Sequence, residues 1–251
     1  MVFYGATDTG MVREMNQDNF IVAKFAEDAL FAVVCDGMGG AAGGSVASSI
    51  AVHSYTSLIK EEEKNSPAFI GMSEQDFSAV MAKAVERANF DVKKKAGEDR
   101  ELEGMGTTLV SCIICGTKAY AVNVGDSRLY LIDEKGITQI TKDHSYVQFL
   151  VDLGKMSYEE ARTAPNKNII TRAVGTEDDI ESDFYPFPVP SGSKILLCSD
   201  GLSNQVEADE IFSIVKDISD GDEAKAACEK LISLANDRGG PDNITAVILS
   251  V

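Results

Sequence analysis

One segment, residues 30–40, constrains the fold more than any other part of this chain. The segment reads LFAVVCDGMGG. Its first six residues are apolar, Asp36 ends this apolar run, and Gly37, Gly39 and Gly40 follow Asp36. A short, continuous apolar run of this kind is typical of a strand that is buried on both faces. An aspartate at the end of such a strand, followed by glycines, lies where the backbone can approach a bound ion closely.

Aspartates stand at the ends of other apolar runs as well. Asp200 follows the run KILLCS, Asp126 follows a strand predicted at 118–124, and Asp242 precedes the last predicted strand, 244–251. Carboxylate oxygens are the ligands that hard divalent cations prefer. Aspartates that are far apart in sequence but all stand at strand ends therefore predict one metal site. For any one of them alone, a simple Asp-Gly turn is the better interpretation.

The hydrophobic pattern divides the chain into blocks of strands and blocks of helices. Ser73 and Asp76 have the spacing of an N-terminal capping box, and residues 116–117 predict a hairpin connection. Strands are predicted at 2–7, 20–24, 30–35, 107–115, 118–124, 129–132, 137–140, 180–184, 195–198 and 244–251, and helices at 43–60, from 73 to about 95, at 208–218 and at 222–236.

This order predicts an α+β fold rather than a parallel α/β sheet. The four strands within 107–140 are interpreted as one antiparallel meander. Two sheets packed face to face would bring several strand ends, with their aspartates, to one rim. The polar segment 142–176 shows weak periodicity apart from a short helix predicted near Glu159, and a stretch of this length inside a domain is more often a functional lid than a passive connection.

Composition limits the classes of partner. The chain has 251 residues and a formal net charge of −17, which argues against nucleic acid or an anionic membrane as a partner, because both are polyanions. The same charge would repel a phosphorylated substrate unless divalent cations neutralised it locally. Five cysteines without regular spacing predict reduced core thiols. Because neither a secretory signal nor an apolar run of membrane-spanning length is visible, we expect a soluble, cytoplasmic protein.

Six polar motifs follow one another along the chain, in an order that resembles the type 2C family of metal-dependent protein phosphatases in its compact bacterial form. The resemblance covers essentially the whole chain. It implies a four-layer α-β-β-α sandwich of two antiparallel sheets flanked by helices, with a single domain over 1–251 and a mobile flap subdomain at about 142–176. The motifs are Gly10-x-x-Arg13-x-x-Asn16-Gln17-Asp18, Asp36-Gly37-Met38-Gly39-Gly40, Gly106-Thr107-Thr108, Val124-Gly125-Asp126-Ser127-Arg128, Ser199-Asp200-Gly201 and Asp242-Asn243-Ile244-Thr245.

The resemblance also implies a centre of two tightly bound Mn²⁺ or Mg²⁺ ions. Asp36 would bridge the two ions and the Gly37 carbonyl would coordinate one of them. Asp200 and Asp242 would hold the other, and Asp126, together with Asp200, would hold a third, weaker ion. Two divalent ions roughly 3.5–4 Å apart neutralise the charge of a phosphomonoester and lower the pKa of a bridging water. Attack on phosphorus would then be in line, without a phosphoenzyme intermediate.

Three further residues are implied in catalysis. Arg13 matches the residue that grips the substrate phosphate, to which a guanidinium offers two parallel donors. Asp18 matches an acidic position that supports metal-bound waters. Where many family members have a histidine as candidate general acid, this chain has Met38, which cannot donate a proton. His144, next to Asp143, is a candidate for that acid, and a purely structural role for His144 as a cap of a strand or turn is an equally weighted alternative.

The implied function is hydrolysis of phosphoserine and phosphothreonine in proteins, by a monomer that opposes a bacterial serine/threonine kinase. Two alternatives stay open: a phosphatase dedicated to one anti-sigma-type regulatory protein, and a non-catalytic module that binds phosphoproteins. Cysteine-nucleophile phosphatases are excluded because no cysteine is followed by five residues and an arginine. The two histidines are too few for a His-rich two-metal site.

Overall fold

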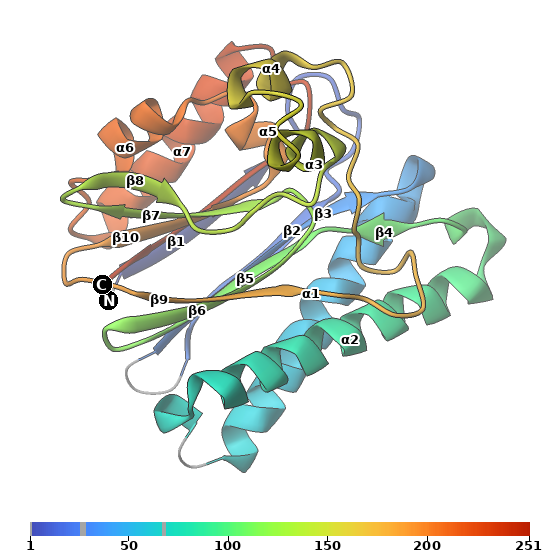
Figure 1. Cartoon of the computed structure of the whole chain (residues 1–251), viewed down its shortest axis with the longest axis horizontal. Coiled ribbons are helices and arrows are strands. Elements are labelled where there is room, and N and C mark those ends of the chain that lie inside the picture. The colour runs from blue at the N-terminus through green and yellow to red at the C-terminus, as the bar shows by residue number, and fades with distance from the viewer. Residues whose placement is uncertain (1, 26–28, 67–68) are drawn as a thin grey trace.

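The computed structural model describes residues 2–25, 29–66 and 69–251. Two antiparallel sheets pack face to face, and helices cover the outer face of each sheet (Figure 1). The α+β sandwich of four layers that the sequence predicts is therefore confirmed. In the described part of the chain, no helix is both long and apolar enough to cross a membrane.

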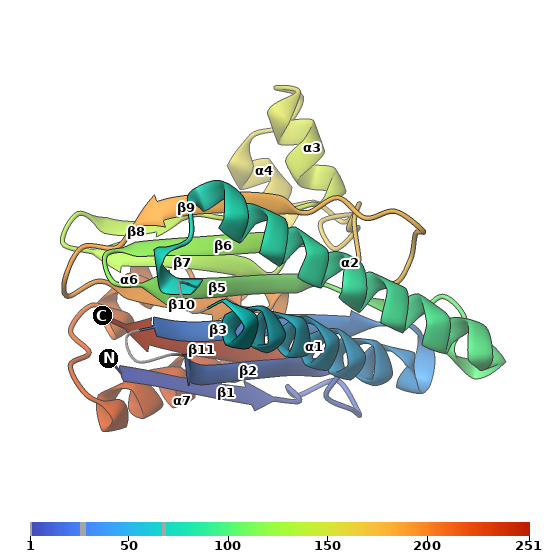
Figure 2. The same cartoon turned by 90° about the horizontal axis from the view of Figure 1, so that it is seen from below.

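Sheet I, as we name it, carries the segment with which the sequence analysis begins. Its strand order is β2-β3-β5-β6-β9, and the short β4 pairs with β3. Helices α1 and α2 run across its outer face (Figure 2). Helix α2 begins with the predicted capping box, because the Ser73 hydroxyl accepts from the Asp76 N–H while the Asp76 carboxylate accepts from the Ser73 N–H. The bounds are β2 Asp18–Phe25, β3 Ala29–Met38, β4 Gly106–Thr107, β5 Leu109–Cys115, β6 Lys118–Val124, β9 Asp183–Pro188, α1 Gly40–Asn65 and α2 Glu74–Glu98, with short 3-10 turns at Phe69–Gly71 and Arg100–Leu102.

Sheet II is built mainly from the two ends of the chain. Its strand order is β1-β11-β10-β7-β8, and α6 and α7 cover its outer face through a cluster of buried apolar side chains. The bounds are β1 Val2–Asp8, β7 Arg128–Asp133, β8 Gly136–Gln139, β10 Lys194–Cys198, α5 Asp200–Ser203, α6 Ala208–Val215, α7 Gly221–Asp237 and β11 Ile244–Ser250.

Strand β3 lies between two layers of core. Successive side chains of a strand point to opposite faces. Phe31 and Val33 accordingly pack in the core under α1 and α2, whereas Ala32 and Val34 pack in the core between the sheets. The same alternation directs the next residue of the second set, Asp36, towards sheet II.

The predicted four-stranded meander over 107–140 is wrong. Strands β5 and β6 form the expected hairpin in sheet I, but β7 and β8 pair in sheet II. The chain changes sheet at Gly125, whose φ of 105° is in the region that favours glycine. A Cβ at this position would lie 2.6 Å from the Thr108 side chain. Periodicity alone cannot distinguish the two arrangements, because β5 and β6 of sheet I and β7 of sheet II all have buried side chains on both faces.

Two further elements differ from the prediction. The strand expected at 180–184 begins three residues later, as β9, and contains Pro186 and Pro188. These prolines are tolerated because β9 is the edge strand of sheet I. The flap contains α4 (Tyr158–Thr163), as expected near Glu159, and also α3 (Tyr146–Asp152), which the weak periodicity does not predict.

All five cysteines are buried and free, as the sequence predicts. Burial raises the pKa of each thiol, to about 11 for Cys115 and to about 12 for Cys198 and Cys228, and it also raises the pKa of Cys35 and Cys112.

Candidate metal centre

A cavity of about 430 Å³ opens at one end of the two sheets. Strands β3, β6 and β10 end there and β11 begins there, because the antiparallel register brings these strand ends together. The cavity wall includes four of the predicted aspartates. Its lining residues are Arg13, Gln17, Asp36, Gly37, Met38, Gly39, Gly40, Thr108, Asp126, Asn168, Ile170, Asp200 and Asp242.

Asp36 is surrounded by the other carboxylates of the site. Its backbone is held by neighbouring threonines, since the Thr108 hydroxyl accepts from the Asp36 N–H at 2.9 Å and the Thr107 hydroxyl donates to the Asp36 carbonyl at 2.8 Å. Burial raises the pKa of the Asp36 carboxyl well above its usual range, and the neighbouring carboxylates, beginning with Asp18 and Asp200, raise it further. A carboxylate in this position is stabilised by a cation that neutralises the cluster.

Asp18 lies behind Asp36, directly opposite it in the β2–β3 register. Its Oδ2 accepts from the hydroxyls of Ser199, directly after β10, at 2.7 Å and of Thr245, in β11, at 2.6 Å. Its Oδ1 is buried and has no hydrogen-bond partner among the described residues. Burial raises the pKa of Asp18 to about 7, although the two hydroxyl bonds oppose the shift. Because Asp18 Oδ1 has no partner in the part of the chain that the structure describes, it can still accept a hydrogen bond.

The other acidic residues, Asp126, Asp200 and Asp242, come from three separate segments, which follow β6, follow β10 and precede β11. Asp200 is the first residue of α5, and its Oδ2 accepts from the Asn204 side chain at 3.0 Å. Burial and the charge of Asp242 raise the pKa of Asp200 to about 6. Asp126 follows β6 and is 9% exposed, and burial, followed by the charge of Asp200, raises its pKa well above the usual range. Segments far apart in the sequence thus place their carboxylates around one cavity.

Gly37 must be a glycine. A Cβ at this position would lie 2.0 Å from the carbonyl oxygen of Gly44, at the start of α1. The N–H of Gly37 donates to the Gln17 carbonyl at 3.2 Å, and the residue lines the cavity. Close packing of α1 against the end of β3 therefore brings bare backbone to the cavity wall, where a carbonyl oxygen can act as a ligand.

Arg13 reaches the rim of the cavity from the loop between β1 and β2. One NH2 group donates to Asp242 Oδ2 at 2.7 Å, and the side chain is 52% exposed. The loop is held in place by Asn243, whose side-chain amide donates to the carbonyls of Thr9 at 2.9 Å and Met15 at 3.0 Å. A guanidinium has five N–H donors in a planar fork, so Arg13 can contact Asp242 and an anion in the cavity together.

These residues fit hard divalent cations of the Mg²⁺ and Mn²⁺ type. In the described part of the chain, no three acidic, histidine or cysteine side chains meet closely enough to enclose an ion by themselves. Mg²⁺, however, is usually bound through one or two carboxylates and keeps several waters. A cavity with spaced carboxylates, a backbone carbonyl and the free oxygen of Asp18 suits such an open, hydrated site.

The structure does not bring His144 to the cavity. The ring is 7% exposed, its Nδ1 accepts from the Gly125 N–H at 3.2 Å, and its Nε2 lies 3.3 Å from Asp183 Oδ2. Burial lowers the pKa of the imidazole despite the Asp183 carboxylate. These contacts connect the start of the flap to Gly125, directly after β6, and to Asp183 in β9. They correspond to the alternative in which His144 has a purely structural role.

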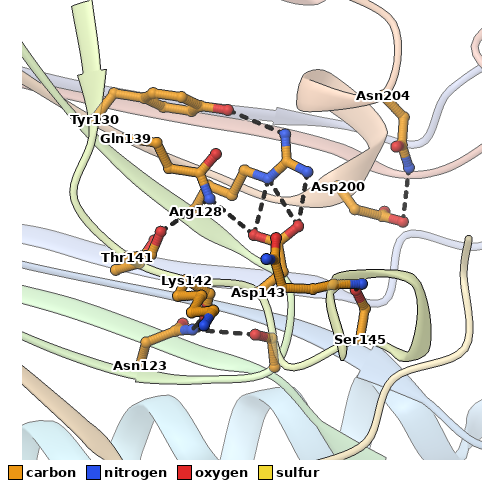
Figure 3. A network of polar contacts seen from close by, with 12 residues as sticks. Asn123, Arg128, Tyr130, Gln139, Thr141, Lys142, Asp143, Ser145, Asp200 and Asn204 are labelled. Atoms are coloured by element: carbon orange, nitrogen blue, oxygen red, sulfur yellow. Dashed lines mark hydrogen bonds and ion pairs between the residues drawn. The ribbon is translucent and has the colours of Figure 1, made fainter. Parts of the chain in front are cut away.

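The root of the flap is held by a largely buried ion pair (Figure 3). Arg128 donates to Asp143 from Nε at 3.0 and 3.1 Å and from NH2 at 2.7 Å, and the two side chains are 22% and 10% exposed. Gln139 donates to Asp143 at 2.9 Å, and Asn123 donates to the Lys142 carbonyl at 3.0 Å. This network connects the flap root to the strands on either side of Asp126.

Some residues of the site carry no predicted role. Ser199 and Thr245 hold Asp18, Asn243 holds the loop of Arg13, and Asn168 and Ile170 line the cavity from the flap. The first three lie within the quoted motifs, beside the aspartates, and that position is the only sequence signal for them. The two flap residues lie in a segment without periodicity.

The whole chain is similar to bacterial serine/threonine phosphatases. It is 36% identical to serine/threonine phosphatase stp of Listeria monocytogenes over 246 residues, which cover 97% of this chain and 93% of that protein. It is 35% identical to serine/threonine protein phosphatase PstP of Mycobacterium tuberculosis, over 98% of this chain and 44% of that longer protein.

Solved structures and a family model give the same result. Phosphatase Stp1 from Staphylococcus aureus superposes with a TM-score of 0.89 at 31% identity, over 100% of this chain and 95% of that one. The catalytic domain of PstP in complex with two manganese ions superposes with a TM-score of 0.81 at 34% identity, over 98% and 96% of the chains. The model described as "Protein phosphatase 2C" matches residues 11–234. With this match over most of its length, the chain belongs to the protein phosphatase 2C family of metal-dependent protein phosphatases.

Proposed function

We propose that the cavity binds two Mn²⁺ or Mg²⁺ ions and hydrolyses phosphoserine and phosphothreonine in proteins. One observation carries the proposal: carboxylates from separate parts of the chain meet in one cavity with Arg13 at its rim. Asp36 would be the ligand shared by both ions, and the Gly37 carbonyl would hold one of them. Asp200 and Asp242 would hold the other, and Asp126 with Asp200 would provide a weaker third site.

Bound ions would neutralise the phosphate and lower the pKa of a coordinated water, which allows direct in-line attack on phosphorus without a phosphoenzyme. The other roles belong to the protein. The guanidinium of Arg13 binds phosphate oxygens and sets the direction of the phosphorus–oxygen bond that breaks. The buried Oδ1 of Asp18 accepts a hydrogen bond from water and orients it.

The proton for the leaving alkoxide comes from water rather than from a side chain. Met38 lines the cavity but has no proton to donate, and His144 is buried behind Gly125 with both ring nitrogens in contact with the protein. Gln17, also in the cavity wall, donates its amide to the Gly40 carbonyl at 3.2 Å. The amide is therefore bonded to backbone and is a poor candidate for the acid.

We further infer that the protein acts as a monomer in the cytoplasm and opposes a serine/threonine kinase. Support comes from the relatives, which are bacterial serine/threonine phosphatases of similar length or with a similar catalytic domain. A phosphatase of this specificity has substrates only where a kinase produces them.

Hydrolysis of a phosphoserine peptide, measured with Mn²⁺, Mg²⁺, Ca²⁺ or chelator, tests the proposal. Activity should require Mn²⁺ or Mg²⁺. Asp36→Asn should abolish it and weaken Mn²⁺ binding in calorimetry, because a ligand shared by both ions loses its charge. Asp237→Asn, an exposed aspartate at the end of α7, is the matched control and should keep both. Full Mn²⁺-dependent turnover by Asp36→Asn would refute the two-metal assignment.

A further inference from the structure

Large apolar side chains that are exposed to solvent are unevenly distributed over the described residues. Eight of the eleven lie in two segments, the loop 9–17 that carries Arg13 and the flap 142–176. These segments make up less than a fifth of the chain. Single exposed apolar side chains are common on globular proteins, but a concentration of them beside a binding cavity is typical of a contact surface.

The first group, which we name the loop patch, consists of Met11, Val12 and Met15, which are 70%, 67% and 46% exposed. Arg13, which lines the cavity, lies among them in the sequence. The backbone of the loop is firmly held: Met11 N–H donates to the Gly240 carbonyl at 2.8 Å, and the Met15 carbonyl accepts from Asn243. These side chains are thus held in solvent by an ordered backbone at the edge of the cavity.

The second group, the flap patch, consists of Tyr146, Phe149, Leu153, Tyr158 and Ile169, all at least 40% exposed. Ile169 stands between two residues that line the cavity, and its carbonyl accepts from the Tyr146 N–H at 2.8 Å. Tyr158 borders a smaller cavity of about 80 Å³ that also reaches two of the acidic residues of the site.

The two patches lie on different sides of the cavity. Arg13 and Gln17 line it from the loop, and Asn168 and Ile170 line it from the flap. In Figure 2 the flap helices α3 and α4 project at one side of the molecule, and the loop that joins β1 to β2 lies at the other. A peptide whose phosphorylated residue enters the cavity would therefore have a patch beside it in each chain direction.

Charge decides which side chains of a substrate suit these surfaces. The chain has a net charge of −17, so acidic residues next to the phosphate would add to the repulsion that the substrate meets. Apolar side chains meet no such repulsion, and they gain from removal of both surfaces from water.

We propose that the loop patch and the flap patch bind apolar side chains on the two sides of the phosphorylated residue, so that the enzyme prefers phosphosites flanked by aliphatic or aromatic residues. This inference rests on the proposed function. Partial burial of one aliphatic side chain on each patch gives a preference of about tenfold in kcat/KM over a site flanked by serine. A site flanked by glutamate should be worse still.

Three phosphoserine peptides, identical except for leucine, serine or glutamate on both sides of the phosphoserine, test the proposal at one Mn²⁺ concentration. The enzymes are the wild type, Met11→Ser/Val12→Ser for the loop patch, Ile169→Ser for the flap patch, and Phe90→Ser as control. Phe90 is a matched control because it is 62% exposed but lies on α2, outside both patches. Each preference is a ratio within one preparation, so it does not depend on the fraction of active enzyme.

The wild type and Phe90→Ser should prefer the leucine peptide about tenfold, and each patch variant, which keeps one of the two patches, should prefer it only about threefold. Equal rates of the wild type on the leucine and serine peptides, or an undiminished preference in both patch variants, would overturn the proposal. Concentration-dependent self-association that both patch variants abolish would also overturn it, because it would assign the patches to a second copy of the chain. An aryl phosphate distinguishes failure of the peptide preference from failure of the proposed phosphatase function. If the wild type hydrolyses neither the aryl phosphate nor any peptide, the proposed function itself fails.

Discussion

The ion pair at the root of the flap permits a quantitative prediction. Arg128 and Asp143 are mostly buried and bonded in a two-pronged geometry, so removal of one partner leaves the other charge mostly buried and unpaired. Breaking such a buried pair typically costs about 3–5 kcal/mol. For a chain of this size, about 1 kcal/mol lowers Tm by about 2–4 °C. Arg128→Met should therefore lower Tm by about 6–20 °C.

Two further variants separate the effect of burial from that of geometry. Arg238 and Glu210 form a pair with the same two-pronged bonding, at 2.6 and 2.8 Å, but both side chains are more than a third exposed. Arg238→Met should lower Tm far less than Arg128→Met, because water screens an exposed ion pair. The double variant Arg128→Met/Asp143→Leu should recover much of the loss, because two apolar side chains replace both charges.

Urea and thermal unfolding of five proteins provide the measurements, all at one pH and one Mn²⁺ concentration: the wild type, Arg128→Met, Asp143→Leu, the double variant and Arg238→Met. The double-mutant cycle between Arg128 and Asp143 then yields their coupling energy directly. If Arg128→Met and Arg238→Met cost the same, or if the double variant is no more stable than either single one, the account of the buried pair is refuted.

Three other predictions concern the site. Arg13→Ala should raise KM for a phosphopeptide more than it lowers kcat, because the guanidinium binds phosphate in the ground state as well; an unchanged KM with a large loss in kcat would contradict this. Asp126→Ala should leave two tightly bound metal ions in calorimetry but lower turnover, and loss of the tight pair would show that Asp126 is misplaced. His144→Asn should slow phosphoserine-peptide and aryl-phosphate hydrolysis equally, whereas a selective loss on the peptide would restore His144 as the proton donor. Burial lowers the pKa of His144 from 6.5, so the unfolded chain takes up this proton first as the pH falls. The stability of the wild type relative to His144→Asn should therefore be constant at high pH and decline below about pH 6.5 in urea unfolding.

The strand-end aspartates could be predicted because two independent signals coincide there. Asp36 follows an apolar run whose alternation also decides which face its side chain takes, and the glycines behind it require close backbone packing. The capping box of Ser73 and Asp76 is similarly local, because its partners are three residues apart. Features of this kind depend on short-range geometry that the sequence contains.

Features that depend on long-range choices could not be predicted. The passage of the chain from sheet I to sheet II at Gly125 depends on which sheet offers an open edge to β7, and no local pattern records that choice. The placement of His144 is of the same type: its partners Gly125 and Asp183 are 19 and 39 positions away. His144 is next to Asp143 in the sequence, but in the fold its ring contacts Asp183 instead.

The burial of all five cysteines separates this enzyme chemically from phosphatases that use a thiolate. Oxidants and alkylating reagents attack the thiolate, and only where they can reach it. The native protein contains only buried thiols, and their pKa values are raised. Peroxide at a concentration that inactivates cysteine-dependent phosphatases should therefore leave this active site untouched. During an oxidative burst, removal of phosphate from serine and threonine would continue while thiol-dependent dephosphorylation stops.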